Sequence, residues 1–437
     1  MKRVVTAIDH MLFFFCSAIS AVVLSAVFLV TLVRRRRATG SDRPKRLSFA
    51  VYDLTSEAYP CLRQEALLDN YFSEEHSLYI DFERPSDESG RIDTGIFNYR
   101  IVAHPARGLY AAGFKKTQAL LTEWKALLTA CAIVRKRGID VVRAHDPHFL
   151  GMNGILVARL FGIPSILHMN SDFDEKYRGT GRTATPAIFV SRSSERFFER
   201  LIMRFYDRIT ADREYYRTSK SFPKDCIGKY RAFGVRVHEA HYAEKNGRKN
   251  MKEQLGVGGR DVLLYVGRLH SVKYPRDAIE ALRFLKEKRP KSALIMVGEG
   301  AMRSELEEQV RRYRLQNDVV FLGSRKPDEL VDIYHTSDVV IAPHGGVTLV
   351  EAALASKPVV AYDFDWHAEF LRNGEMGFMV PFGDVWGLAE AVSTLLNDRL
   401  MRERFGARAR EIAETNNSRR ASLDREKGIY RELLRTG

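Results

Sequence analysis

The feature that most constrains the fold of this sequence is an alternation between short apolar runs and longer amphipathic stretches. Runs rich in β-branched residues predict buried strands, and the amphipathic stretches between them predict helices that cover a parallel sheet. A first series of predicted strands comprises Ser48–Tyr52, Ser77–Ile80, Asp140–Arg143, Ser165–His168 and Arg208–Thr210. A second series comprises Val262–Val266, Ala293–Val297, Val319–Leu322, Val339–Ala342, Val359–Ala361 and Phe378–Val380. We therefore expect an α/β protein with two doubly wound, Rossmann-like parallel sheets.

A polar segment at residues 243–252 separates the two series and predicts a linker. We expect an N-terminal, acceptor-side domain at 47–242 and a C-terminal, donor-nucleotide domain at 253–414. Residues 415–437 are expected to form a helix that returns to the N-terminal domain. Ligands of such sheets bind at the carboxyl ends of the strands, so the two domains are expected to face each other across a ligand cleft.

An uncharged apolar run of 23 residues, 11–33, precedes the first domain. As a helix it reaches about 35 Å, enough to cross a hydrocarbon core of about 30 Å. A cleaved signal peptide is the alternative, but its apolar region is normally shorter, and Arg34 to Arg37 stand where a small-residue cleavage site would be expected. The sequence predicts a single-pass transmembrane helix over 11–33, preceded by a short extracytoplasmic segment at 1–10.

Basic residues concentrate in a collar at 34–46, directly after the apolar run. The positive-inside rule places this collar and the body that follows in the cytoplasm, at the inner (plasma) membrane. The formal net charge of +14 and the collar predict contact with an anionic membrane surface. We expect no nucleic acid partner, because no recognised binding module is present. The four cysteines lack CxxC spacing and predict neither a zinc site nor a disulfide framework.

A cationic loop follows the first predicted strand of the second series. Gly267 permits close backbone approach to a ligand, and Arg268 and Lys273 flank the loop. A guanidinium fork and an ammonium charge can bind a diphosphate and stabilise the leaving nucleotide as its charge develops. The alternative is a pair of solvated surface cations.

A second cluster follows another strand of the same series: His344, Gly345, Gly346, Thr348 and Glu351. The glycines turn the chain and a helix begins near Thr348, so its free N–H groups predict an anion site for phosphates. Glu351 lies one turn into this helix and is expected to accept hydrogen bonds from a ribose. The alternative is that Thr348 and Glu351 form a capping box that only fastens the helix start.

Polar residues also end two neighbouring predicted strands of the first series. His145 and Asp146 follow one strand, and His168 and Asn170 follow the next. Both pairs are expected at the same edge of the sheet. The alternative for each histidine is a hydrogen bond to a loop carbonyl.

The order of motifs GRL-x3-K, VGEG, GG-x-TLVEAAL-x-SKPVVAYD and GFMVPFGD resembles the C-terminal domain of the GT-B-fold glycosyltransferases of family 4, the glycosyl transferases group 1. The resemblance covers about residues 260–412, and the first domain matches more loosely. It implies a retaining hexosyltransferase that uses a nucleotide-diphosphate sugar and no cofactor. No metal is expected, because the sequence has no DxD motif after a strand and no metal-ligand spacing.

Carried over to this sequence, the resemblance makes Arg268 and Lys273 the diphosphate-binding pair and Glu351 the residue that holds the ribose. Gly298 and Glu299 match the turn beside the base.

On the acceptor side the resemblance makes His168 and His145 the catalytic candidates, with His168 facing the reacting carbon of the donor sugar. Asp146 and Asn170 are expected beside them. Arg63 resembles a family loop that often contacts acceptor or phosphate.

One departure from the family concerns the donor sugar. The first glutamate of the family's E-x7-E motif, which contacts the sugar, would fall at Pro343. His344 is a candidate to replace it as a neutral hydrogen-bond partner.

The leading hypothesis is sugar transfer to a lipid-linked acceptor at the cytoplasmic leaflet, in assembly of a cell-surface glycan, because an anchor concentrates the enzyme over a membrane-bound acceptor. A sugar-nucleotide epimerase or phosphorylase is an alternative, because GT-B folds host both. A non-catalytic membrane-bound scaffold is a further alternative, suggested by Pro343.

Overall fold

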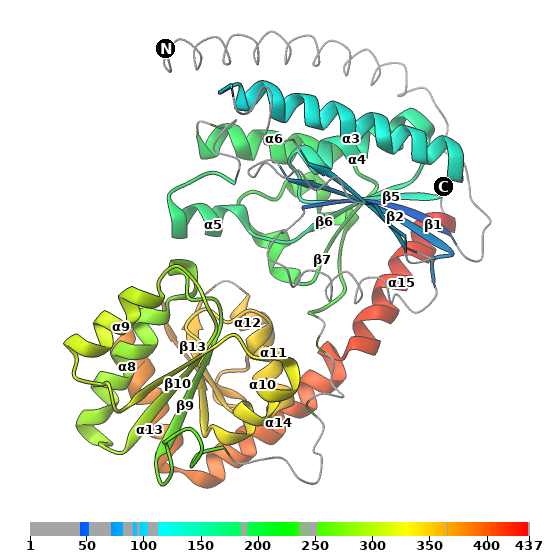
Figure 1. Cartoon of the computed structure of the whole chain (residues 1–437). Helices are drawn as coiled ribbons and strands as arrows, with labels where there is room; N and C mark the ends of the chain where they lie inside the picture. The colour runs from blue at the N-terminus through cyan, green and yellow to red at the C-terminus, as the bar shows by residue number, and fades with distance from the viewer. Residues whose placement is uncertain are drawn as a thin grey trace.

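The computed structural model describes residues 44–51, 71–81, 91–93, 97–103, 112–184, 189, 191–235, 237, 242, 251–364 and 366–435. These residues form two α/β domains, each built on its own sheet (Figure 1). The expectation of two parallel sheets is confirmed. The predicted transmembrane helix at 11–33, most of the basic collar, most of the linker at 243–252, and Arg63 lie outside the described residues.

Among the described residues, the first sheet contains eight strands: β1 (Lys45–Val51), β2 (Glu74–Asp81), β3 (Arg91–Asp93), β4 (Phe97–Ala103), β5 (Val141–His145), β6 (Ser165–Met169), β7 (Arg208–Ala211) and β8 (Tyr230–Ala232). Their order is β3-β4-β2-β1-β5-β6-β7-β8, and every pair is parallel except β3–β4. The helical segments of this domain are α3 (Lys115–Arg137), α4 (Phe149–Phe161), α5 (Phe173–Thr180), α6 (Arg192–Phe205), η1 (Glu214–Thr218) and η2 (Lys224–Lys229). The prediction missed β3, β4 and β8.

In the part of the chain that the structure describes, the second sheet has six parallel strands: β9 (Asp261–Val266), β10 (Ser292–Val297), β11 (Val319–Gly323), β12 (Val339–Ile341), β13 (Val359–Asp363) and β14 (Gly377–Pro381). Their order is β11-β10-β9-β12-β13-β14. The intervening helical segments are η3 (Ser271–Lys273), α8 (Pro275–Lys288), α9 (Arg303–Arg312), α10 (Pro327–Thr336), α11 (Val347–Leu354), α12 (His367–Phe370) and α13 (Val385–Asn397). Two long helices, α14 (Arg399–Asn417) and α15 (Arg419–Arg435), end the described chain.

Both faces of the second sheet are buried, which explains why its strands are continuous apolar runs. Side chains alternate between the two faces of a strand. Val262 and Leu264 of β9 pack with α10, α11 and α14 on one face, whereas Leu263 and Tyr265 pack with α8, α9 and α13 on the other. The carboxyl ends of the strands, and the loops that follow them, are thereby fixed from both sides.

The last helix, α15, runs from the second domain back onto the first sheet (Figure 1). Its Leu423 and Tyr430 share an apolar cluster with Val141 of β5 and Ile166 of β6. The Tyr430 hydroxyl also accepts a hydrogen bond from Nη1 of Arg46 at 2.9 Å. The apolar surface of the first sheet is thus covered in part by α15, which follows the second domain in the sequence.

No helix in the part of the chain that the structure describes is both long and apolar enough to cross a membrane.

Candidate functional site

The loop after β9 is folded against the loop after β10. The Gly267 amide donates to the Val297 carbonyl at 3.0 Å, and the Leu269 amide donates to the Glu299 carbonyl at 2.9 Å. The Tyr265 hydroxyl lies 3.3 Å from the Arg268 carbonyl and 3.4 Å from the Lys273 carbonyl. These bonds fix the backbone of the loop that carries both predicted phosphate-binding cations.

The loop after β12 meets this cationic loop. Nδ1 of His344 lies 2.6 Å from the Val272 carbonyl, so a proton on Nδ1 makes the bond. The Thr348 hydroxyl donates to the Val266 carbonyl at 3.0 Å, which ties the start of α11 to the end of β9. A Cβ placed on Gly346 would lie 3.7 Å from the Lys273 Nζ. The ammonium group therefore lies beside the first free N–H groups of α11, where an anion binds favourably.

The capping-box alternative is wrong. The helix begins at Val347, its N-cap is Gly346, and no side chain caps it. Thr348 lies inside the helix, and its hydroxyl donates a hydrogen bond to the Val266 carbonyl of β9 instead. The amide groups at the helix start therefore have no side-chain oxygen of Thr348 or Glu351 as a partner.

The turn predicted to lie beside the base is packed against the cationic loop. Gly298 has φ 132°, and a Cβ there would lie 2.0 Å from the Gly267 carbonyl oxygen. Only glycine fits such an approach. Glu299 Oε1 lies 2.7 Å from the position that a Cβ on Gly323 would occupy. Gly267, Gly298 and Glu299 are thus brought together at the ends of β9 and β10.

Glu351 has partners that the sequence analysis missed. Its Oε2 accepts a hydrogen bond from the Tyr334 hydroxyl of α10 at 2.9 Å, and the Tyr242 hydroxyl also bonds the carboxylate. Burial raises the pKa of Glu351, and the two tyrosine bonds counteract part of that shift. No local pattern could reveal this pairing, because Tyr242 and Tyr334 come from separate elements.

In the first domain the structure brings all four described candidates together at the ends of β5 and β6. Asn170 Nδ2 lies 3.1 Å from Nδ1 of His145, and the Asn170 amide donates to Oδ1 of Asp146 at 3.0 Å. The rings of His145 and His168 meet edge to face at 5.3 Å. Burial raises the pKa of Asp146, and the Asn170 amide counteracts part of that shift. Asp146 holds a left-handed φ of 64°, which turns the chain here.

His168 is held by residues that the sequence analysis did not single out. Its Nδ1 lies 3.3 Å from the Thr210 hydroxyl of β7, and Phe233 stacks on the imidazole at 5.3 Å with an interplanar angle of 16°. Two contacts fix the ring plane, as a positioned acid or base requires. Thr210 could have been found, because it stands at the end of the next predicted strand.

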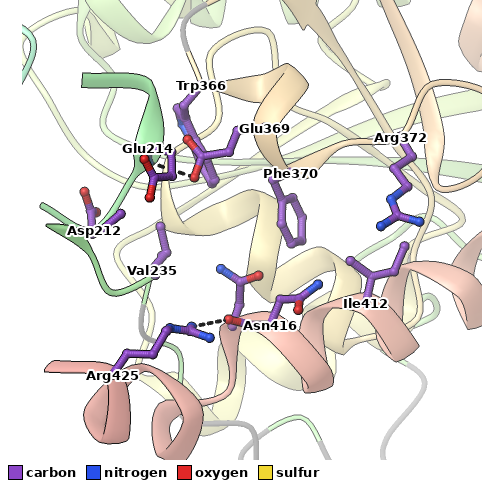
Figure 2. A pocket seen from close by; sticks show the side chains of 13 residues that line it. Asp212, Glu214, Val235, Trp366, Glu369, Phe370, Arg372, Ile412, Asn416 and Arg425 are labelled. Carbon is purple, nitrogen blue, oxygen red and sulfur yellow. Dashed lines mark hydrogen bonds between the residues drawn. The ribbon is translucent and has the colours of Figure 1, made fainter. Parts of the chain in front are cut away.

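The two domains touch through α12 and η1. Both carboxylate oxygens of Glu369 accept backbone N–H bonds, from Glu214 and Tyr215, each at 2.9 Å. Figure 2 shows Glu369 and Glu214 side by side, with Trp366 next to them. Trp366 donates from Nε1 to the Gly345 carbonyl at 3.1 Å, and the Tyr216 hydroxyl donates to the Asn170 carbonyl at 3.3 Å. One chain of contacts therefore links the glycine turn before α11 to the strand ends of the first domain.

A cavity of about 290 Å³ lies behind this contact and is lined by both domains, including Asp212, Val235, Phe370 and Arg425 (Figure 2). On another side of the interface, α5 of the first domain lies beside η3, which carries Lys273. The first domain therefore contacts the predicted phosphate loop directly.

Within the described residues, one group has metal-like geometry: His148, Glu195 and Glu199. Nη1 of Arg192 lies 2.8 Å from Glu195 and 2.6 Å from Glu199. Burial lowers the pKa of His148, but bonds to the two glutamates outweigh burial and raise the pKa to about 9. A guanidinium and a protonated imidazole repel a metal ion, so this group is a buried ion-pair network.

Comparison with known proteins finds a family match within the second domain. Residues 247–412 match the family described as glycosyl transferases group 1. The chain is 24% identical to alpha-D-kanosaminyltransferase of Streptomyces kanamyceticus, over 64% of this chain and 73% of that protein. It is 35% identical to glycogen synthase of Mycobacterium tuberculosis, over 34% of this chain and 37% of that protein. A phosphatidyl-myo-inositol mannosyltransferase of Mycobacterium leprae is 38% identical, over 27% and 32% respectively. The chain thus spans only about a third of the last two relatives.

Solved structures support the two-domain fold. HepE of Anabaena, solved with UDP and glucose, has a TM-score of 0.67 at 19% identity and covers 90% of this chain and 100% of its own. Sucrose-phosphate synthase of Thermosynechococcus elongatus has a TM-score of 0.71 at 18% identity with the same coverage. The arrangement is consistent with the GT-B fold, and the matched domain and the relatives' names support transferase activity.

Proposed function

We propose that this chain, whose second domain is a glycosyl transferases group 1 domain, transfers a sugar from a nucleotide-diphosphate donor. The observation that carries the proposal is that Lys273 and the uncapped start of α11 converge at Gly346, where a Cβ added to the glycine would lie 3.7 Å from the Lys273 Nζ. A diphosphate bound there contacts an ammonium charge and the positive end of a helix dipole.

The same groups supply the electrostatic part of the reaction. As the bond between sugar and phosphate breaks, negative charge grows on the leaving diphosphate. Lys273, Arg268 and the α11 amides stabilise that charge. Retention of configuration, by front-face displacement, follows from the family resemblance and needs no protein nucleophile. UDP is the first donor nucleotide to test, because HepE was solved with UDP and glucose.

The acceptor side of the proposal rests on the first domain. His168 and His145, with Asp146 and Asn170, adjoin η1, which contacts the second domain. We assign His168 as the group that meets the reacting centre. The uncharged run at 11–33 supports a single-pass anchor at the inner membrane with a cytoplasmic body, and hence a lipid-linked acceptor. The name of the Mycobacterium leprae relative includes a phospholipid acceptor.

The test compares Arg268→Ala with His168→Ala in the full chain in detergent. A saturating nucleotide stabilises a protein by about 2.7 kcal/mol at 100 times its Kd, so UDP-glucose, GDP-mannose and dTDP-rhamnose are screened by thermal shift. Arg268→Ala is expected to abolish the shift. His168→Ala is expected to retain the shift but to lower sugar transfer to a lipid extract by at least about 100-fold.

Arg311→Ala is the matched control, because Arg311 is an exposed arginine of the same domain that pairs with Glu308 on α9. It should behave as wild type in both assays. An unchanged shift in Arg268→Ala would contradict the donor site. Donor turnover without any acceptor would favour the epimerase or phosphorylase alternative.

A further inference from the structure

A cluster of aromatic rings lies at the carboxyl end of the second sheet. It comes from the segments that follow or end β9, β12, β13 and β14: Tyr274, His344, Tyr362, Phe364 and Phe382. Phe364 and Phe382 stack at 4.7 Å with an interplanar angle of 29°. Tyr274 meets Phe382 edge to face at 5.3 Å, and His344 meets Phe364 in the same manner at 5.3 Å. Four separate segments thus contribute to one aromatic surface.

This surface is open to solvent. Tyr362 is fully buried and forms its base, whereas Tyr274 and Phe364 are half-buried. Phe382 is 47% exposed, and Val347 at the start of α11 is 44% exposed. Adjoining apolar side chains that remain in water mark a binding surface more often than isolated ones do.

The aromatic surface adjoins the proposed phosphate site. Tyr274 follows Lys273 directly, Val347 follows Gly346, and His344 bonds the Val272 carbonyl. The sheet order places β10, with Gly298 and Glu299 at its end, on one side of the β9–β12 pair. It places β13 and β14 on the other side. A donor with its base near β10 and its phosphates at the centre therefore extends its sugar toward the aromatic surface.

The backbone of Tyr274 is strained. Its φ and ψ are 49° and 46°, a left-handed conformation that costs a bulky residue about 1–2 kcal/mol. Such strain persists where the surrounding structure holds the residue, and it concentrates at binding sites. Here the strain directs the ring toward Phe382, whereas glycine would fit the same backbone without cost.

We infer that Tyr274, Phe364 and Phe382 stack against the sugar ring of the donor and determine which sugar is accepted. The inference rests on the proposed function. Pro343 stands where the family resemblance expects the carboxylate that contacts the sugar, so apolar packing replaces a hydroxyl-specific bond. The site suits a neutral hexose or deoxyhexose with an apolar C–H face. Loss of one hydroxyl from such a sugar should change affinity by no more than about 100-fold.

The experiment separates binding of the nucleotide from binding of the sugar. UDP, GDP and dTDP, and then UDP-glucose, GDP-mannose and dTDP-rhamnose, are titrated calorimetrically into the full chain in detergent. Phe382→Ala is expected to weaken the affinity for the sugar nucleotide about tenfold. The affinity for the matching nucleoside diphosphate should change by no more than about twofold. Phe382→Leu keeps apolar volume without a ring, so its affinity for the sugar nucleotide should lie between those of wild type and Phe382→Ala.

A second variant removes a ring with little loss of stability. Tyr274→Gly relieves the left-handed strain, which offsets part of the lost ring packing, so the melting temperature should fall only slightly while the preference for the sugar nucleotide over the diphosphate falls. The control is Trp386→Ala, because Trp386 is 45% exposed on α13 and packs on Phe284, outside the cluster. The affinities of Trp386→Ala for the nucleoside diphosphate and for the sugar nucleotide should both match those of the wild type.

The inference would be overturned if Phe382→Ala weakened the affinities for the diphosphate and the sugar nucleotide equally, or weakened neither. Either result would leave the phosphate site intact. An effect on the acceptor KM alone would also overturn it. If no nucleotide binds the wild-type chain, the proposed function fails first and this inference fails with it.

Discussion

Glu123 of α3 is a carboxylic acid in an apolar interior. Its Oε2 accepts a hydrogen bond from Asn153 of α4, and it is packed among Leu120, Leu127 and Leu156. Burial raises the pKa of Glu123 to about 8, and the Asn153 bond counteracts part of that shift. At neutral pH this group is therefore mainly protonated in the folded state.

The protonation of Glu123 predicts a stability that falls with rising pH. The folded pKa is raised from 4.5 to about 8, so its contribution is full below pH 4.5 and is lost as pH rises through about 8. Glu123→Gln keeps an oxygen for Asn153 and removes the titration. In urea unfolding at pH 5, 7 and 9, the free energy of unfolding of the wild type should fall by up to about 1.4 kcal/mol per pH unit relative to that of Glu123→Gln.

Glu308→Gln is the control for this titration, because Glu308 is exposed on α9. The dependence of its unfolding free energy on pH should be parallel to that of the wild type. Parallel curves for Glu123→Gln would mean that the carboxyl reaches solvent or another charge in the folded protein.

At the level of residues, the structure brings two predicted strand ends of the donor site together, whereas the donor-binding roles of Arg268, Lys273 and Glu351 stay predictions. Lys273 and Gly346 were expected to converge because both follow strands of one sheet, and parallel strands share an edge. The partners of Glu351 and His168 were not foreseen, because Tyr242, Tyr334 and Phe233 approach from elements whose packing no local pattern specifies. The catalytic and acceptor-side assignments of His168, His145, Asp146 and Asn170 stay predictions.

Among the helices, α6 has an unusual distribution of side chains. Its buried face carries Arg192, Glu195 and Glu199 as well as two apolar residues, whereas Phe197 is 71% exposed and Leu201 is also exposed one turn later. Arg200 and Arg204 lie next to these apolar residues. A helix with apolar residues outward and a cationic border suits the interface of an anionic bilayer.

This arrangement predicts that α6 touches lipid. In the full chain inserted in liposomes that contain phosphatidylglycerol, Phe197→Trp should add fluorescence that brominated lipid quenches. The quenching should weaken when phosphatidylcholine replaces the anionic lipid, because the attraction of the arginines is lost.

Leu400→Trp is the matched control, because Leu400 is 77% exposed on α14 of the second domain. Its added fluorescence should be insensitive to brominated lipid. Equal quenching at both positions would show nonspecific adsorption and contradict a role for α6.

Element boundaries were easiest to predict in the second domain. Each of its strands is a short apolar run and the four central strands are largely buried, so every expected range lies within one or two residues of the observed one. In the first domain, β3 pairs antiparallel at an edge and β8 has only three residues. Neither produces an apolar run long enough to stand out.

At the scale of the whole molecule, α15 fastens the chain's end to the first sheet. Arg143 of β5 and Glu426 of α15 form an ion pair at 3.3 Å, with side-chain exposures of 1% and 3%. Desolvation makes such a pair costly to form and more costly to break, because the remaining charge stays buried. The pair therefore specifies where α15 docks.

Removal of one partner is predicted to be severe. Glu426→Ala should lower the unfolding free energy by about 3–5 kcal/mol, because it leaves the Arg143 guanidinium buried without its counter-charge. Replacement of both, Glu426→Leu with Arg143→Met, should recover most of the loss. Urea unfolding of the three variants checks this, and a loss in the double variant equal to that of Glu426→Ala would contradict the argument.

The docking of α15 also has a consequence for biosynthesis. The first domain precedes the second in the sequence, yet the layer that covers Val141 and Ile166 is synthesised only after the second domain. The first domain therefore exposes an apolar patch to solvent while the second domain is being synthesised. The packing of the first sheet can therefore be completed only after α15 has been made, and a chain that terminates prematurely near residue 415 would expose that patch to chaperones and proteases.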